Sequence, residues 1–340
     1  MGKRGSPLEN MVKVKEGFWK KRRVLVTGPT GLVVSWLIKD LVRAGASVAA
    51  LMFDSDPQSE LYLSGDIERI ETVYGQLEDF PALERLVRDY AVNTIFHLGA
   101  QTIVERAQQF PLSTFEANIR GTYNLLEACR IHRGLVQNII VASSDKAYGE
   151  HDKLPYLEDA PLIGRYPYEV SKTCTDLIAQ SFYHSYRLPV AVIRCGNIYG
   201  GGGLNWSRII PGTIRSLLEK KNPIIRSDGT YVRDYIYVKD VVQGYMAIVE
   251  HLKTKKLAGE AFNLGPEKPA NVMQLVREIQ KLMRCEKIKP RILNQAKGEI
   301  HSQFLSSKKI TAKIGWKPRY SLREGLSETI GWYREFLAHK

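Results

Sequence analysis

Short apolar segments alternate with amphipathic segments through the first two thirds of the chain. "RVLVTG" (23–28) is an apolar run that ends near a glycine, and apolar residues at helical spacing follow over 32–43. The same alternation predicts further strands at 47–53, 94–100, 137–145 and 189–200, and helices at about 115–132 and 167–186. Strands that alternate with helices of this length predict a parallel sheet covered by helices on both faces.

The pattern becomes irregular after Tyr199, where four glycines (200–203) interrupt it. Beyond them the spacing predicts helices over 207–220, 271–284 and 321–337, and a strand over 261–266. We therefore predict an α/β fold, with a doubly wound Rossmann sheet and a smaller C-terminal α/β domain. The expected boundaries are 16–195 for the first domain, with 235–263 returning to it, and 196–234 with 264–340 for the second.

Composition excludes several classes of protein. The 340 residues are 44% hydrophobic, which is enough to bury one large core or two unequal ones. No apolar run reaches the roughly 18 residues of a membrane helix, and the first ten residues lack the apolar core of a secretion signal. We therefore expect a cytoplasmic protein with no membrane partner, and disorder over residues 1 to about 15.

The cysteines and the charge argue against a metal site and against nucleic-acid binding. Cys129, Cys174, Cys195 and Cys285 have no CxxC spacing and lie in apolar segments, so we expect reduced thiols and no metal. The net charge is +13, but the 49 basic residues are scattered, with short clusters at 20–23 and 253–256. No zinc-finger, RRM or helix-turn-helix pattern accompanies them, so we expect a solvated basic surface and no nucleic-acid partner.

Gly28 and Gly31, in "TGPTGLVVS", lie between the first predicted strand and its helix. Glycines there allow a tight turn and a close backbone approach, and a helix N-terminus offers unpaired N–H groups to a pyrophosphate. Val34 stands where a third glycine would let the helix pack closely on the strand. The motif is therefore incomplete, and by itself it fits a plain strand–helix turn equally well.

Tyr168 and Lys172, in "YPYEVSK", are four residues apart on a predicted helix and face the same way. A lysine cation near a phenol lowers the pKa of that phenol from about 10, and Ser144 at the end of a predicted strand supplies a second hydroxyl. Because this pair accompanies the glycine turn and the serine, we interpret it as a site for proton transfer.

Together these motifs resemble the extended short-chain dehydrogenase/reductases, and within them the nucleotide-sugar epimerases and 4,6-dehydratases. The resemblance covers about residues 18–337 and includes "VLVTGPTG", "IFHLGAQ", "NIRGTYNLLEAC", "SSDKAYG", "YPYEVSK", "RCGNIYGGG" and "SDGTYVRDYIYVKDVV". It is greatest to the CDP-glucose 4,6-dehydratases, which share the acid–lysine pair after the strand serine. They also share a substrate loop that includes Arg208 and Pro211 in this sequence.

The resemblance implies that Tyr168 takes the proton of the sugar 4-hydroxyl while NAD⁺ accepts the C4 hydride. The 4-ketone then acidifies C5–H, and water leaves across C5 and C6 with Asp145 as the acid and Lys146 as the base, before the hydride returns to C6. Most 4,6-dehydratases carry glutamate at the position of Lys146. A lysine must be neutral to act as a base, and Lys172 and the nicotinamide would lower its pKa. An ordinary ion pair between Asp145 and Lys146 is the alternative.

The resemblance also implies NAD as the cofactor of the first domain. Asp54 follows the second strand, where it could bond a ribose 2′-hydroxyl and would repel a 2′-phosphate, so NAD is favoured over NADP. Gln76 stands where the family often has an aspartate that contacts adenine. The expected cofactor-binding residues are Thr27, Gly28, Thr30, Gly31, Leu32, Asp54, Gln76, Leu77, Leu98, Ala100, Asn118, Tyr168 and Lys172.

A nucleotide-diphosphate sugar is the substrate that the resemblance implies for the second domain. Bidentate arginines suit diphosphates. The expected substrate-binding residues are Gln101, Asn197, Trp206, Arg208, Arg226 and Arg233. "SDGTYVRDYIYVKD" is typical of the UDP- and dTDP-sugar enzymes, so the nucleotide stays open. The family commonly forms homodimers through the helices that carry 118–130 and 168–184, and we expect His97 and His184 in the core.

Two other functions stay compatible with the sequence. An NDP-sugar 4-epimerase would use the same tyrosine but would not need Asp145 and Lys146, since it only returns the hydride to C4. A non-catalytic dinucleotide-binding regulator would explain the incomplete turn at Val34, although the presence of Ser144 and Tyr168 argues against it.

Overall fold

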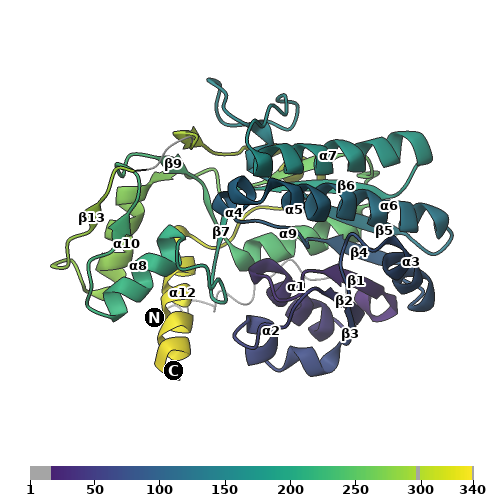
Figure 1. The fold of residues 1–340 in the computed structure, drawn as a ribbon, viewed down its shortest axis with the longest axis horizontal. Helices are drawn as coiled ribbons and strands as arrows, with labels where there is room; N and C mark the ends of the chain where they lie inside the picture. The colour runs from purple at the N-terminus through teal and green to yellow at the C-terminus, as the bar shows by residue number, and fades with distance from the viewer. Residues whose placement is uncertain (1–16, 296–298, 339–340) are drawn as a thin grey trace, which may run out of the picture.

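The computed structural model describes residues 17–295 and 299–338, and the predicted disordered N-terminus lies outside these ranges. A seven-stranded sheet forms the larger part of the molecule, in the order β11-β6-β5-β4-β1-β2-β3 (Figure 1). All of its strand pairs are parallel. Its strands are β1 (Arg23–Thr27), β2 (Ser47–Met52), β3 (Glu71–Tyr74), β4 (Thr94–His97), β5 (Asn138–Ala142), β6 (Val190–Cys195) and β11 (Ala261–Leu264).

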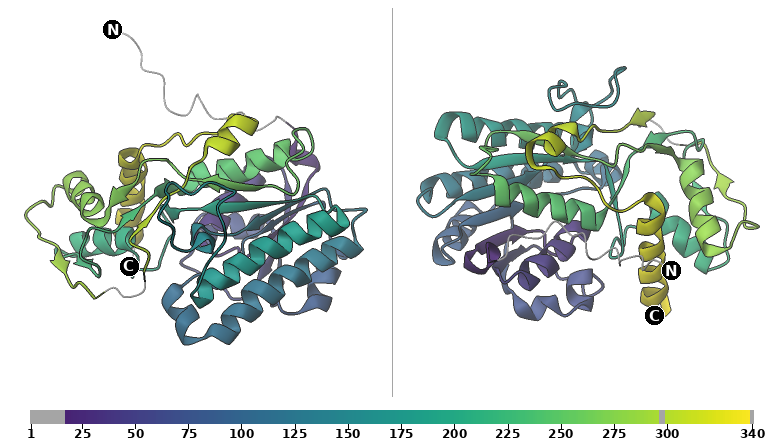
Figure 2. Two further views of the ribbon diagram at one scale, coloured as in Figure 1. Left: turned by 90° about the horizontal axis from the view of Figure 1, so that it is seen from above. Right: turned by 180° about the vertical axis from the view of Figure 1, so that it is seen from behind.

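Helices cover both faces of this sheet, as Figure 2 shows from two sides. The helices α1 (Leu32–Arg43) and α9 (Val238–His251) contact each other on one face. On the other face α6 lies between α3 and α7; their bounds are α3 (Phe80–Asp89), α6 (Gly121–Ile131) and α7 (Pro167–Tyr186). Because both faces are buried, β1 reads as a continuous apolar run: Val24 and Val26 join one core cluster and Leu25 joins the other.

The order of the strands reverses between β1 and β4, since the chain adds β2 and β3 on one side of β1 and the later strands on the other. In a sheet of this kind the crevice beside the carboxyl ends of the strands, at the point of reversal, is the usual place of a ligand. Before α6 the chain passes through the short helices α4 (Val104–Gln109) and α5 (Pro111–Phe115) and a π-helical turn, η4 (Glu116–Arg120).

A second lobe lies beside the sheet, on the left in Figure 1. It contains the helices α8 (Ile209–Leu218), α10 (Val272–Met283) and α12 (Leu322–Ala338), with α10 in contact with both others. Its short strands are β8 (Ile224–Ile225) paired with β13 (Arg291–Ile292), and β9 (Val232–Arg233) between β12 (Ala270–Asn271) and β14 (Ser302–Gln303). At its junction with the sheet, β7 (Asn197–Tyr199) pairs with β10 (Tyr235–Tyr237), and α11 (Lys308–Ile314) contacts β11.

The predicted fold class, α/β with a doubly wound parallel sheet, is confirmed, and α1 and α7 begin and end where the spacing predicts. His97 is buried as expected. The prediction that His184 is a core residue is wrong. The buried face of α7 runs through Lys172, Asp176 and Ala179, and His184 is turned away from it and exposed.

Three further properties bear on the expectations from composition. All four cysteines are free: Cys129 and Cys195 are buried, and Cys174 and Cys285 are half-buried. Within 17–295 and 299–338, no helix has both the length and the apolar character that crossing a membrane requires. In the same ranges no group of three or more His, Cys, Asp or Glu side chains is placed to hold a metal ion.

Candidate active site

The turn between β1 and α1 has the backbone geometry that its glycines predict. Gly28 has a φ of +71°, and a Cβ added to it would lie 2.9 Å from the Cα of Gly99, so the turn after β1 touches the loop after β4. Gly31 is the exposed N-cap residue of α1, and no side chain caps the helix there. The first N–H groups of α1 thus stay available to a pyrophosphate. Val34 is buried in the core beside the sheet, so this helix packs closely without a third glycine.

Thr27 ties the carboxyl ends of β1 and β4 together. Its Oγ1 accepts hydrogen bonds from the backbone N–H groups of Leu98 (3.1 Å) and Gly99 (2.8 Å). The same oxygen lies 3.0 Å from Nδ1 of His97. Burial lowers the pKa of His97 to about 3, so this imidazole is neutral and acts as a structural hydrogen-bonding group.

Asn118 holds the loop after β4 against α7. Its Oδ1 accepts from the backbone N–H of Gln101 (2.7 Å), and its Nδ2 donates to the carbonyl of Gln101 (3.0 Å) and to Oγ of Ser171 (2.9 Å). Asn118 is buried and lies in the π-helical turn η4. The amide therefore fixes the backbone beside Ala100 and Gln101, two of the predicted ligand contacts.

The remaining predicted cofactor contacts follow the neighbouring strands β2 and β3. Asp54 and Gln76 are both exposed at the carboxyl edge of the sheet. Leu77 is half-buried and packs so close to Gly121 that a Cβ there would lie 2.5 Å from its own Cβ. Residues Thr30 and Leu32 flank the exposed Gly31 at the start of α1. The structure thus puts the predicted contacts along one edge of the sheet, and their role as cofactor ligands stays a prediction.

Ser144, Tyr168 and Lys172 lie together at the end of β5. Tyr168, in the first turn of α7, is buried and forms a hydrogen bond with Ser144. Burial raises the pKa of the Tyr168 phenol, while the Ser144 hydroxyl and the Arg208 guanidinium lower it. The Nζ of Lys172 donates to the backbone carbonyl of Ala142 (2.8 Å), and burial lowers the pKa of Lys172 to about 8. The predicted stabilisation of the phenolate by Lys172 stays a prediction.

Asp145 and Lys146 begin a short helical turn, η5 (Asp145–Tyr148), for which Ser144 is the cap. The Ser144 hydroxyl accepts from the backbone N–H of Lys146 and donates to Oδ1 of Asp145, both at 3.1 Å. The two side chains are not within ion-pair distance of each other, and the Lys146 ammonium has no hydrogen-bond or ion-pair partner in the described part of the chain. Among the described residues, the structure therefore shows no direct ion pair between Asp145 and Lys146.

Burial moves the pKa values of this acid and this base toward each other. Asp145 is only 4% exposed, and burial raises the pKa of its carboxyl although Lys146 and Ser144 lower it. Burial also lowers the pKa of Lys146, Arg233 lowers it further, and Asp145 opposes both effects. Burial therefore disfavours the charged form of both side chains, which is the direction that an acid and a base in one site need.

Two residues that the motifs did not single out complete this part of the site. Glu169 accepts hydrogen bonds at Oε2 from the backbone N–H groups of Arg165 (2.9 Å) and Tyr166 (3.3 Å), so it caps α7 and lies close enough to raise the pKa of Lys146. The glutamate three residues after Tyr166 is the sequence signal of such a cap. Gln303, in β14, donates from Nε2 to the backbone carbonyl of Asp145 (2.8 Å), and no sequence pattern indicates that contact.

The predicted substrate contacts fall into two groups. Arg208, the N-cap residue of α8, and the buried Arg233 lie close enough to shift the pKa values of Tyr168 and Lys146 respectively. Arg233 already donates to the backbone carbonyls of Val232 (2.8 Å), His301 (2.9 Å) and Ile300. Both arginines therefore lie near the residues that are predicted to transfer protons.

The other substrate contacts lie at the junction of the second lobe with the sheet or within the second lobe. Asn197 begins β7, where its backbone N–H donates to the carbonyl of Asp234 (3.1 Å). The centroid of the Trp206 ring lies 5.5 Å from that of Tyr333, within the lobe itself. Arg226 is exposed and pairs with Glu105 of α4, so it bridges the second lobe and the sheet. Their roles toward a substrate stay predictions.

Comparison with known proteins agrees with this geometry. Residues 25–329 match the family model described as GDP-mannose 4,6 dehydratase. The chain is 28% identical to the CDP-glucose 4,6-dehydratase of Salmonella typhimurium, over 95% of this chain and 94% of that protein. It is 26% identical to the dTDP-D-glucose 4,6-dehydratase of Homo sapiens, over 92% of this chain and 90% of that one.

Solved structures give the same relationship. A dTDP-glucose 4,6-dehydratase from Streptomyces venezuelae with NAD bound superposes with a TM-score of 0.83 at 26% identity, covering 92% of this chain and 97% of that one. A UDP-glucose 4-epimerase from Thermotoga maritima also gives a TM-score of 0.83, at 27% identity, covering 93% and 99%. The resemblance inferred from the motifs is confirmed, and the chain belongs to the GDP-mannose 4,6 dehydratase family.

Proposed function

We propose that this protein is an NAD-dependent nucleotide-sugar 4,6-dehydratase that converts an NDP-hexose, with CDP-glucose the first candidate, into an NDP-4-keto-6-deoxyhexose. The observation that carries the proposal is the buried Asp145 with the half-buried Lys146 beside Ser144 and Tyr168, at the end of β5. The 4,6-dehydratases among the relatives support the same reaction.

The residues at the carboxyl edge of the sheet suit NAD. A dinucleotide needs a turn without side chains at its pyrophosphate and a carboxylate near its ribose. The turn at Gly28 and Gly31 and the exposed Asp54 support these two roles. No arginine lies in "LMFDSD" to attract a 2′-phosphate. When bound, NAD supplies the acceptor and later the donor of a hydride.

The chain's own residues supply the proton transfers. We assign to Tyr168, with Ser144, the removal of the proton from the sugar 4-hydroxyl. Once C4 is a ketone, Lys146 takes the C5 proton in its unprotonated form. The C6–O bond breaks as the leaving hydroxyl receives a proton from Asp145 and departs as water. Burial raises the pKa of Asp145 and lowers that of Lys146, and both shifts are in the direction that this elimination needs.

An NDP-sugar 4-epimerase is the second candidate. The fold does not decide between the two, because an epimerase and a dehydratase superpose equally well on this chain. The acid–base pair favours the dehydratase, since an epimerase removes no proton from C5 and protonates no leaving group.

The substrate would lie between the sheet and the second lobe. Arg208 is a candidate for the diphosphate because it is exposed and lies close enough to Tyr168 to lower the pKa of the phenol. Arg233 is buried and has its guanidinium engaged by backbone carbonyls, so we assign it to the electrostatics of Lys146 and not to direct binding of the diphosphate.

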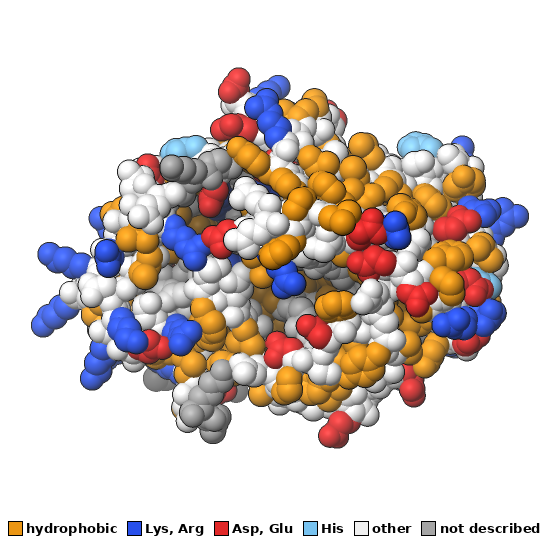
Figure 3. All heavy atoms as spheres, viewed as in Figure 1, with side chains coloured by type: hydrophobic (Ala, Val, Ile, Leu, Met, Phe, Trp, Pro, Cys, Tyr) orange, Lys and Arg blue, Asp and Glu red, His pale blue; other side chains and the backbone are white. Residues whose placement is uncertain are grey.

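The proposed assembly is a homodimer in the cytoplasm. Figure 3 shows apolar side chains gathered over the region of α4, α5 and α7. Phe110, Leu112 and Leu177 are exposed there by 56%, 72% and 53%. Large apolar residues exposed together favour a partner surface, and a second copy would cover them with the same residues. The four free cysteines suit a reducing compartment.

One experiment separates the candidate functions. The purified protein would be incubated with NAD⁺ and each of CDP-, dTDP-, UDP- and GDP-hexoses, and the products would be analysed by mass spectrometry. Loss of the mass of one water identifies the dehydratase. An isobaric product with a new configuration at C4 identifies the epimerase, and NAD binding without turnover identifies a non-catalytic regulator.

A further inference from the structure

A second pocket lies at the opposite edge of the sheet from the proposed active site. It has a volume of about 810 Å³ and is lined by Asn138 at the start of β5 and by Leu188 and Pro189 just before β6. Strands of five or six residues, about 17–20 Å long, separate it from the carboxyl edge. A pocket of this size can hold a nucleotide, and a ligand here would not compete for the space at Gly28.

Basic side chains from four separate parts of the chain line this pocket. They are Arg22 before β1, Arg133 after α6, Arg187 at the end of α7, and Lys253 and Lys256 after α9. Glu250 is the acidic residue of the lining, and one of its oxygens accepts a hydrogen bond from the indole of Trp19 (2.7 Å). Within the described ranges none of the five cations forms an ion pair; Arg22 donates to the amide of Gln137 (2.6 Å).

The positive charges that line this pocket exceed the negative charge of the neighbouring helix ends. The helices α6, α7 and α9 end at this pocket, and basic residues often complement the negative end of a helix dipole. Each helix end amounts to about half a negative charge, so three ends and Glu250 offset about 2.5 of the five positive charges. A surplus of roughly two to three positive charges is left, which is sufficient to attract a di- or triphosphate.

Aromatic rings accompany the cations. Tyr186, at the end of α7, lines the pocket and is 48% exposed. Tyr183 lines it as well, with the Arg187 guanidinium 5.4 Å from its ring centroid. Tyr183 is half-buried and its ring packs against Gly259, whereas Tyr186 exposes its ring and has the Arg130 guanidinium 5.3 Å from its centroid. An exposed aromatic ring beside arginines is a surface on which a planar base can stack.

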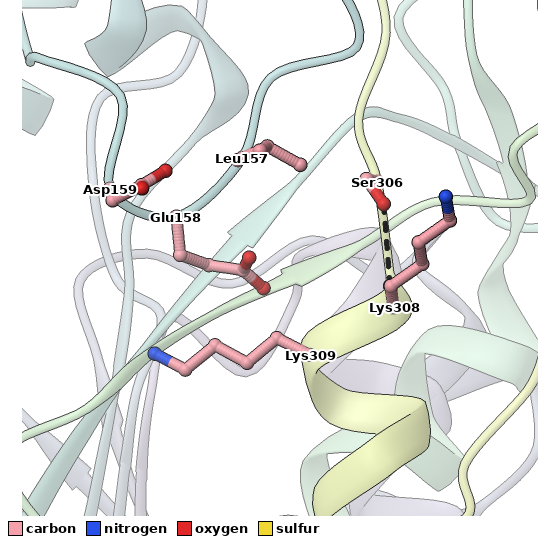
Figure 4. Close-up of a pocket in the computed structure, with 6 residues that line it drawn as sticks. All are labelled: Leu157, Glu158, Asp159, Ser306, Lys308 and Lys309. Carbon is pink, nitrogen blue, oxygen red and sulfur yellow. Dashed lines mark hydrogen bonds between the residues drawn. The ribbon is translucent and has the colours of Figure 1, made fainter.

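The smaller pocket between residues 157–159 and 306–309 shows the contrast (Figure 4). Its volume is about 440 Å³, and its two lysines are matched by two carboxylates, Glu158 and Asp159. The Lys309 ammonium is already bound to Glu260 (3.0 Å) and to the carbonyl of Ala261 (2.9 Å). That pocket has no surplus charge to offer a ligand.

We infer that the basic pocket at the amino-terminal edge of the sheet binds a nucleoside di- or triphosphate, independently of the proposed active site. Phosphates meet Arg133, Arg187 and Lys253, which form no ion pairs in the described ranges, and the base meets the exposed ring of Tyr186. Free inorganic polyphosphate could bind the cations but has no base to stack on an aromatic ring.

Calorimetric titration tests this inference. The full-length protein, saturated with NAD⁺ and CDP so that the active-site region is blocked, is titrated with ATP, with inorganic pyrophosphate and with adenosine. We expect ATP to bind, pyrophosphate to bind at least about tenfold more weakly, and adenosine not to bind. Failure of ATP to bind overturns the inference, and pyrophosphate that binds as tightly as ATP overturns the assignment of a nucleotide.

Charge reversal locates the site. Arg133 and Lys253 are exposed and form no ion pair within the described ranges, so Arg133→Glu with Lys253→Glu should fold normally and weaken ATP binding at least about tenfold. The matched control reverses Lys281 and Lys287, two exposed lysines of the second lobe, and should leave the dissociation constant unchanged. Equal effects of the two double variants would mean that only net charge is sensed and would contradict the site. Because binding is read without turnover, the result is independent of the reaction that the enzyme catalyses.

Discussion

The amide of Gln303 donates a hydrogen bond to the backbone carbonyl of Asp145 at a distance of 2.8 Å. Gln303 is fully buried in β14, and its Oε1 has no partner among the residues that the structure describes. The contact joins a strand of the second lobe to the turn that presents Asp145 and Lys146. It therefore makes the position of the proposed acid and base depend on a segment 158 residues farther along the chain.

We predict that Gln303→Leu slows the elimination of water without weakening substrate binding. The variant removes the bond to Asp145, so the pair loses its position relative to C5 and C6, and kcat should fall about tenfold or more. KM should stay within about a factor of two. The deuterium isotope effect at C5 should rise as proton removal becomes rate-limiting, which loss of folded protein alone would not produce. The control is Gln108→Leu, at an exposed glutamine of α4, which should leave both constants and the isotope effect unchanged.

Tyr168→Phe tests the first proton transfer. The phenol forms a hydrogen bond with Ser144, and loss of a positioned general base typically costs a factor of about 10² to 10⁴. We expect turnover to fall by that factor while NAD binding, measured by calorimetry, is unchanged. A rate equal to that of the parent protein would remove Tyr168 from the mechanism.

Lys146→Met tests the second proton transfer, the removal of the proton from C5. Without the amine, oxidation at C4 should proceed but the C5 proton should stay in place, so reduced cofactor and the 4-keto sugar should accumulate in a single turnover. The control is Lys153→Met, a lysine exposed in the following loop, which should behave like the parent protein. Normal product formation by Lys146→Met would favour the interpretation of Asp145 and Lys146 as a structural feature.

The stability of the protein should depend on pH through Asp234. Its Oδ2 accepts from the backbone N–H of Leu305 (2.8 Å), and its Oδ1 is buried without a partner in the described ranges. Burial raises the pKa of Asp234 to about 7, whereas an unfolded aspartate has a pKa of about 4. Between these values the folded state binds more protons, so this carboxyl makes the free energy of unfolding fall as the pH rises from about 4 to 7.

Asp234→Asn should flatten that dependence, because the amide keeps the shape of the side chain and does not titrate. We expect the variant, compared with the parent protein, to gain about 1 kcal/mol or more between about pH 5 and pH 8 in urea unfolding. Parallel stability curves for the two proteins would show that Asp234 does not titrate in this window.

The ion pair of Asp176 and Arg194 should matter more than any surface pair. Both side chains are buried, the nearest N–O distance is 2.7 Å, and Arg194 also donates to the hydroxyl of Tyr148 (2.8 Å). Asp176→Ala leaves a buried guanidinium without its counter-ion, so we expect a loss of about 3–5 kcal/mol in the free energy of unfolding. The control is Asp89→Ala, whose exposed pair with Arg88 should contribute at most about 1 kcal/mol. Similar losses in the two variants would contradict the importance of burial.

The parts of the fold that could be predicted are those with a strong local pattern. The apolar face of α1 and the apolar runs of β1 and β5 identify these elements without reference to the rest of the chain. The edge strand β3 escapes such a pattern, because most of its residues are exposed and its sequence "ETVY" has no apolar run. The helix α3 is also absent from the predicted elements, although Leu83, Leu86 and Val87 give it a buried face.

The residues of the candidate site also divide into those that a local pattern identifies and those that only the folded chain brings together. Tyr168 and Lys172 can be found because one helix sets their spacing, and Ser144 because it ends a strand. The contact of Gln303 depends on the pairing of β14 with β9, which no local spacing encodes. The basic residues of the second pocket look scattered for a similar reason: residues 22 and 253 are distant in sequence and meet only in the folded chain.

The course of the chain through the second lobe limits how the protein can be divided. The chain leaves the sheet after β6, returns for α9 and β11, leaves again for α10 and β14, and returns for α11 before α12 completes the lobe. No single cut therefore releases either half. A chimaera that exchanges substrate preference between two relatives would need matched junctions at every crossing, and a nicked protein should keep its fragments associated.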